Sequence, residues 1–179
     1  MPQSITNLKQ QSGSVAIETI FLLPIIVILL FAVIHYCMIF FAASMFDHVA
    51  KESIRQSMAF VNEECYFSYK NCSGAEVLTE VTPTIRTHAK IIIQGFTQGQ
   101  GESLGSLFGV TLPDPEELIR ISTITDPIDG SDICCQVTIV LDEYRTTPFL
   151  PTNIIDGLLP KEVSVFPDQI VGTAVLKLN

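Results

Sequence analysis

The hydrophobic residues of this chain are concentrated in one block near its N-terminus. From Thr19 to Phe46 the sequence reads TIFLLPIIVILLFAVIHYCMIFFAASMF, without a formally charged residue. At about 1.5 Å rise per residue, a helix of this length exceeds the roughly 30 Å hydrocarbon core of a bilayer. The pattern predicts one transmembrane helix. Pro24 lies one turn into it and is expected to bend it, because proline removes an intrahelical hydrogen bond.

A cleaved secretory signal peptide is the competing interpretation of the block, with a cut near Ala42, Ala43 and Ser44. Such peptides have an apolar core of about 7 to 15 residues behind a basic front end. The apolar run here is about twice as long, and Glu18 stands at its entrance. A membrane-spanning helix is therefore favoured.

The helical pattern continues beyond the block. Phe46, Ala50 and Ile54 recur on one face, which extends the predicted helix to roughly 45 residues, or about 70 Å. A solvated face carries charges at four-residue spacing: Asp47, Lys51 and Arg55.

The remaining chain alternates between a helix, a loop and strands. A second helix is expected from Ala75 to Gln94, broken or restarted around Pro83. The following QGFTQGQGESLGSLFG has five glycines in sixteen residues and predicts a flexible loop. Apolar alternation then predicts strands over Leu118–Thr125, Ile133–Tyr144, Val163–Phe166 and Ile170–Leu178, with DPIDGSD as a hairpin turn. The fold class is α+β, with a small antiparallel sheet packed on the long helix.

Charge separates the two parts of the chain. The net charge is -9, and from Asp47 onward there are 18 acidic and 9 basic residues. This excess repels phosphate backbones and argues against nucleic-acid binding. Lys9 and the amino terminus in front of the block balance Lys51 and Arg55 behind it, so loop charges do not set the orientation. The large, acidic, cysteine-bearing C-terminal part is placed outside the cytoplasm.

Four cysteines follow the block: Cys65, Cys72, Cys134 and Cys135. In an oxidising compartment disulfides are favoured over free thiols. Cys134 and Cys135 are adjacent on a predicted strand and point to opposite faces, so cross-pairings with Cys65 and Cys72 are more plausible than a 65–72 loop. No CxxC or HxxxH accompanies them, which fits zinc poorly.

Motifs for catalysis or metals are weak, and neither an enzyme nor a cofactor is expected. The GESLG stretch, Gly101–Gly105, matches GxSxG, but a hydrolase of that type needs its histidine later in the chain. His35, His48 and His88 all come earlier. The aspartates of the DPIDGSD turn do not have EF-hand spacing, and the turn explains them without calcium.

The chemistry that stands out lies at the mouth of the apolar block. An acidic residue there is costly if it faces lipid, so Glu18 is a functional candidate unless it merely snorkels to the headgroups. Gly13 precedes it by five residues, followed by SVAI. This resembles the prepilin cleavage signature of type IV pilins and pseudopilins. The resemblance implies a cut between Gly13 and Ser14, and a Glu18 that pairs with the terminal ammonium of a neighbouring subunit.

A closer resemblance lies in GSVAIETIFLLPIIVILLFAVIHY, followed by AKESIRQSMAF. This order is similar to TadE-type pseudopilins of the tight-adherence (Flp pilus) apparatus, although His35 replaces an expected acidic or other polar residue. It implies a minor pilin or pseudopilin that assists assembly or export of an adhesive Flp pilus. The implied partners are the prepilin peptidase, other pilin-like subunits and the inner-membrane assembly platform.

The expected organisation is a leader over residues 1–13, a transmembrane helix over 14–46 and an extracytoplasmic domain over 47–179. The protein would cross the bacterial inner membrane once, with its C-terminal domain in the periplasm or outside the cell. The alternative is a membrane-anchored or secreted binding domain unrelated to pili.

Overall fold

A computed structural model describes residues 12–60, 74–125, 132–151 and 166–176. Its contacts divide the chain into two units, Met1–Cys37 and Met38–Asn179. One helix, α1 (Ser12–Ser57), runs through both without a break and contains Pro24. Its 46 residues confirm the prediction of one long N-terminal helix.

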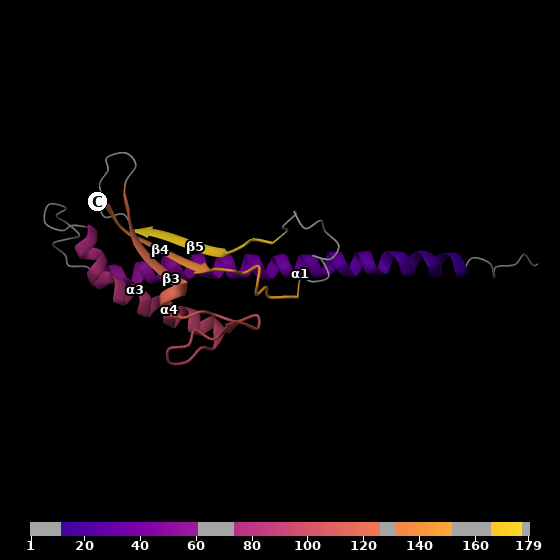
Figure 1. Cartoon of the computed structure of the whole chain (residues 1–179), viewed down its shortest axis with the longest axis horizontal. Helices are drawn as coiled ribbons and strands as arrows, with labels where there is room; N and C mark the ends of the chain where they lie inside the picture. Colours follow the sequence, from indigo (N-terminus) through magenta and orange to yellow (C-terminus); the bar gives the residue numbers. More distant parts are fainter. Residues whose placement is uncertain (1–11, 61–73, 126–131, 152–165, 177–179) are drawn as a thin grey trace, which may run out of the picture. The chain divides into compact units, whose positions relative to one another are not determined.

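The second unit combines this helix with further helices and two small sheets (Figure 1). After α1 and the short 3₁₀ helix η1 (Met58–Phe60) comes the helix α3 (Gly74–Thr97). A hairpin of β1 (Ser106–Leu107) and β2 (Val110–Thr111) precedes the single-turn helix α4 (Pro115–Leu118). The strands β3 (Ile119–Thr125), β4 (Asp132–Leu141) and β5 (Ile170–Leu176) complete the unit.

The larger sheet has the order β3-β4-β5 and is antiparallel throughout. Its register places Ile119 opposite Ile139, and Ile139 opposite Gly172. The pairing of β3 with β4 confirms the predicted hairpin, whose turn lies outside the described residues. Of the two strands predicted near the C-terminus, Ile170–Leu178 is confirmed as β5, while Val163–Phe166 lies mostly outside the described residues.

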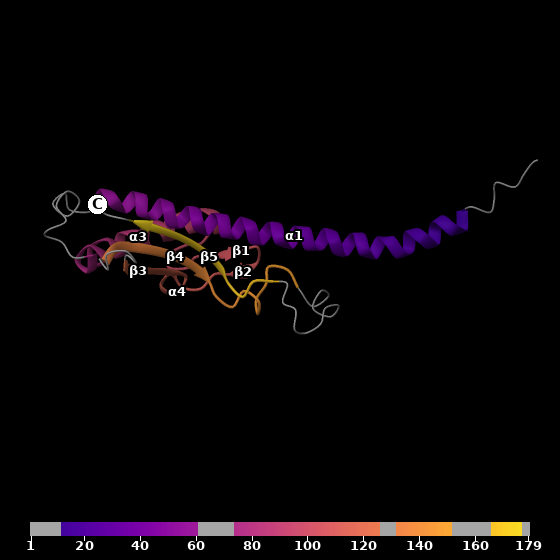
Figure 2. The same ribbon diagram turned by 90° about the horizontal axis from the view of Figure 1, so that it is seen from above.

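Alternation along β4 directs one of its faces into the core. Cys135, Val137, Ile139 and Leu141 are all buried there, as strand periodicity predicts. They join one hydrophobic cluster with Phe46 and Val49 of α1 and with the buried stripe of α3. Both helices therefore pack on this sheet, which confirms the α+β, pilin-like arrangement. Figure 2 shows β5 running beside the 38–57 part of α1 and in the same direction.

Helix α3 is continuous, so the predicted break at Pro83 is wrong. Its buried positions recur every four residues through the proline: Val77, Val81, Ile85, Ala89 and Ile93. Pro83 itself lies on the exposed face, where the loss of one backbone hydrogen bond is tolerated. The Thr87 hydroxyl donates to the Pro83 carbonyl at 2.8 Å, one turn further along the same exposed face.

The glycine-rich stretch after α3 is also more ordered than predicted. Leu104 and Leu107 are buried in the core, and Gln94 Nε2 donates to the carbonyls of Gly101 and Ser103. The Thr97 hydroxyl donates to the Leu104 carbonyl. Glycine is needed where the chain folds back on itself, because a Cβ on Gly105 would lie 2.8 Å from Gly99 N, and Gly105 has φ +77°.

Candidate functional site

The largest exposed apolar surface belongs to the first part of α1. Ile20 and Phe21 are 68% and 72% exposed, and most of their apolar neighbours through Ile34 are exposed as well. A helix that is apolar on every side is suited to lipid or to partner helices, because soluble monomers rarely expose so large a patch. Within the part of the chain that the structure describes, α1 is also the one helix that is long and apolar enough to cross a membrane.

The two halves of the predicted processing signal lie within the first two turns of this helix. Helix α1 begins at Ser12, so the peptide bond between Gly13 and Ser14 lies in its first turn. Glu18 follows about one turn later and is exposed. No charged residue follows it until Asp47. Glu18 is therefore a single carboxylate at the start of an uncharged helical surface.

Pro24 lies inside α1, and the helix continues through it. Its ring nitrogen carries no hydrogen, so the helix lacks the hydrogen bond that residue 24 would otherwise donate. The proline belongs to the exposed apolar stretch. Membrane helices tolerate such a residue more readily than soluble helices.

The predicted disulfide residues are placed only in part. Cys135 is buried in the core on β4. Cys65 and Cys72 lie outside the described residues, and so does the side chain of Cys134. Their pairing stays a prediction. Cys37 is exposed on α1, whereas His35, two residues earlier, is fully buried.

Four aromatic rings in the second unit form a connected group that sequence reasoning missed, here called the aromatic cluster: Phe41, Phe108, Phe149 and Tyr144. The ring centroids are 5.6 Å apart for Phe41 and Phe108, 5.1 Å for Phe108 and Phe149, and 4.9 Å for Phe149 and Tyr144. All three pairs meet edge to face, a favourable geometry for aromatic rings. The cluster thus connects α1, the β1–β2 turn and the segment after β4.

Tyr144 is the buried end of the aromatic cluster. Its hydroxyl oxygen accepts a hydrogen bond from the Phe149 amide at 3.4 Å. Burial raises the pKa of the Tyr144 phenol, because the anion is poorly solvated there, and the bond from Phe149 partly offsets this. The sequence signal for the β1–β2 turn is the FG pair inside SLFGVT, which belongs to the stretch predicted as a flexible loop.

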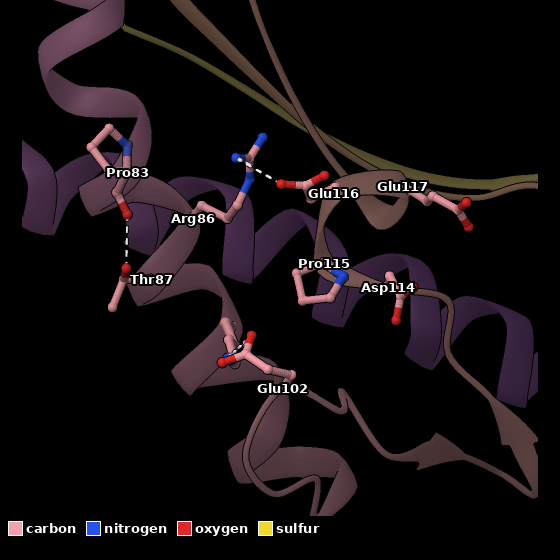
Figure 3. A pocket seen from close by; sticks show the side chains of 9 residues that line it. Pro83, Arg86, Thr87, Glu102, Asp114, Pro115, Glu116 and Glu117 are labelled. Carbon is pink, nitrogen blue, oxygen red and sulfur yellow. Dashed lines mark hydrogen bonds and ion pairs between the residues drawn. The ribbon is translucent and has the colours of Figure 1, made fainter.

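A polar groove of about 670 Å³ lies between α3 and α4. Figure 3 shows Arg86 reaching toward Glu116, and these side chains approach to 3.8 Å. Lys90 contacts Glu102 at 2.6 Å. The groove is lined by two basic and four acidic residues, together with Pro83, Thr87 and Pro115: Arg86, Lys90, Glu102, Asp114, Glu116 and Glu117.

The charges of this groove are mostly solvated and balance one another only in part. The side chains of Glu102 and Glu116 are 94% and 82% exposed, so their ion pairs contribute little to stability. Each basic residue already faces a carboxylate, and the acidic residues are in excess. The groove therefore repels phosphate-type ligands, in keeping with the acidic composition of the chain.

The GESLG stretch does not adopt the geometry of a nucleophile elbow. It follows α3 and leads into β1, whereas an elbow follows a strand and leads into a helix. Ser103 is exposed, and its hydroxyl accepts a hydrogen bond from the Gly105 amide at 3.2 Å. The serine closes a local turn.

Residues 13–55 match the model of the TadE-like protein family. Over these residues the chain is TadE-like. The match covers about a quarter of the sequence and coincides with α1. This match implies a protein related to the tight-adherence (Tad) pilus, with components of that system as partners, and the TadE-like family consists of assembly components not known as enzymes. Comparison with curated proteins and with solved structures yields no match.

Proposed function

We propose that this protein is a minor pilin or pseudopilin that assists assembly or export of an adhesive Flp pilus. The observation that carries the proposal is the coincidence of the TadE-like segment with an exposed apolar helix that has one carboxylate near its start. In this role it has no catalytic activity of its own. The alternative, an anchored or secreted binding domain unrelated to pili, assigns no functional role to the carboxylate of Glu18.

The first step of the proposed function is processing by the prepilin peptidase. The cut follows Gly13, removes residues 1–13 and leaves Ser14 as the new N-terminus. Glycine at this position suits the step, because its low helix propensity eases local unwinding of the first turn of α1 for the peptidase.

The second step is charge pairing inside the membrane. After the cut, the Glu18 carboxylate and the ammonium of Ser14 on a neighbouring copy or another pilin-like subunit attract each other strongly in low dielectric. A carboxylate left alone there is costly, so the pair sets the register between adjacent helices. The bend at Pro24 then shapes the helix just beyond the pairing site.

The proposed topology is a single pass through the bacterial inner membrane. Residues 14–46 form the apolar segment that crosses the membrane, and its last residues, Ala42, Met45 and Phe46, pack in the core of the domain. Residues 47–179 form the rest of that domain in the periplasm or outside the cell, where it meets the assembly platform. The burial of Ala42, Met45 and Phe46 in the domain core supports an anchor over a cleaved signal peptide. A cut near Ser44 would remove Ala42 from that core and leave Met45 and Phe46 at a new terminus.

The deciding experiment is the intact mass of the protein from membranes of cells with an active or an inactivated prepilin peptidase. We expect the active enzyme to shorten the chain by its first thirteen residues, and a Gly13→Leu variant to keep full length in both strains. A mature protein that begins at Met1 or near Met45 in the active strain would overturn the proposal.

A further inference from the structure

The tip of the β1–β2 hairpin carries an aromatic residue at a position whose backbone conformation does not favour one, although its ring packs against Phe41 and Phe149. Leu107 pairs with Val110, so Phe108 and Gly109 form a two-residue turn, with φ +51° and +86°. Such turns favour asparagine, aspartate and glycine. A bulky residue in the left-handed region costs about 1 kcal/mol or more. Phe108 is nevertheless there and 39% exposed.

The same tip lies beside the end of the apolar run of α1. The Phe108 ring contacts Phe41, which is itself 47% exposed, and the adjacent Phe40 is 74% exposed. From Ala42 onward one face of α1 enters the domain core. Met38 and Ile39 are already partly buried against that core and His35 is fully buried, so Phe41 lies within the stretch over which the helix changes from exposed apolar surface to a helix covered by protein.

The hairpin also differs in charge from the rest of the domain. LGSLFGVTL, from Leu104 to Leu112, contains no charged residue. The chain from Asp47 onward has twice as many acidic as basic residues. An acidic surface is repelled by anionic headgroups, whereas an uncharged segment with an aromatic tip suits the membrane interface.

We propose that Phe108 dips into the headgroup layer on the outer side of the inner membrane and gives the domain a second lipid contact beside α1. This contact rests on the proposed single-pass anchorage. It places the membrane boundary near Phe41, in the stretch where α1 enters the domain core. The partner is a lipid surface, with the aromatic ring at headgroup depth and the Phe41 contact beneath it.

Tryptophan fluorescence tests the contact, because the chain has no tryptophan. Single-tryptophan variants of the full chain are reconstituted into vesicles of phosphatidylcholine brominated at one acyl position. Phe108→Trp reports on the tip and Leu30→Trp on the membrane segment. Val175→Trp is the matched control, since it is 51% exposed near the end of β5, which runs away from the Phe41 level. Ser106→Trp, exposed in the same hairpin, serves as a second reporter if the tip variant does not fold.

With bromine at an acyl position close to the headgroup, we expect the fluorescence of Phe108→Trp to be quenched about threefold more than that of Val175→Trp. Equal weak quenching of both, with strong quenching of Leu30→Trp, would overturn the lipid contact and leave the anchorage intact. Weak quenching of all three would overturn the anchorage as well. The Phe108→Trp tryptophan could instead be protected from quenching at a high protein-to-lipid ratio and lose this protection when more lipid is added. That result would show that a second copy of the chain covers the tip, which also contradicts the proposal.

Discussion

Gly172 of β5 lies directly against the backbone of Phe46 in α1. A Cβ built on Gly172 would approach the Phe46 carbonyl carbon to 2.3 Å and the Phe46 Cβ to 2.7 Å. Real Cβ atoms do not come this close, so the helix rests on the strand only because residue 172 has no side chain. This contact fixes the separation between α1 and the sheet.

Gly172→Ala should therefore destabilise the domain. We expect a loss of about 1 to 3 kcal/mol in the free energy of unfolding, since the helix must shift in a packed core. Thr173→Ala, at the exposed neighbouring position, is the control and should change stability by less than about 0.5 kcal/mol. Urea unfolding of the full chain in detergent measures both, and equal stabilities would contradict the close contact.

Thr97→Val should be destabilising because it removes a buried hydroxyl that has two acceptors. Thr97 donates to the carbonyls of Ile93 and Leu104, so valine leaves the Leu104 oxygen without this donor in the core. We expect a loss of about 1 to 3 kcal/mol. Thr87→Val is the matched control, because its hydroxyl bonds within α3 at an exposed position. Thermal unfolding of the two variants should differ by several degrees, and identical transitions would refute the role of Thr97.

Glu18→Gln should weaken association between subunits without preventing membrane insertion. Loss of one partner of a buried ion pair costs about 3 kcal/mol or more, which corresponds to roughly 100-fold in affinity. Co-purification from detergent extracts measures the association. Glu80→Gln, an exposed carboxylate on α3, should have no effect. Unchanged association of Glu18→Gln would leave snorkelling as the better account of this residue.

Alkaline stability should depend on Tyr144. Its pKa is raised above the ordinary value of 10.0 by burial, so the folded state resists deprotonation. A raised folded pKa contributes stability that is complete below pH 10 and lost as pH rises through the higher folded value. Tyr144→Phe should flatten this part of the stability profile. Spectroscopic titration would contradict the prediction if Tyr144 ionised at the ordinary tyrosine pKa of 10.0.

The sequence predicted the elements whose pattern is long and periodic. The apolar block with Phe46, Ala50 and Ile54 behind it predicted α1, and alternation at Val137, Ile139 and Leu141 predicted β4. These predictions are correct because each element buries one face, and the spacing of the apolar residues along the sequence identifies that face.

The errors arise where tertiary contacts override local preference. Pro83 is compatible with a continuous helix because the buried stripe of α3 is on the opposite side. The glycines around Gly105 predicted a flexible loop, but they allow the backbone at Gly105 to pack closely against the backbone at Gly99. Two of the three ring pairs in the aromatic cluster join residues about 40 to 70 positions apart along the chain, a separation that no local pattern reports.

Helix α1 is one helix over the described residues 12–57, so its apolar part and its core part share one backbone hydrogen-bond ladder. A pull applied to its first turns is therefore transmitted along the helix to the packing of Phe46 and Val49. The subunit should yield by rupture of its own core. A soluble fragment made for mechanical or crystallographic work should accordingly start at Met38 and not at Asp47, because the shorter piece lacks the side chains that fill the interior.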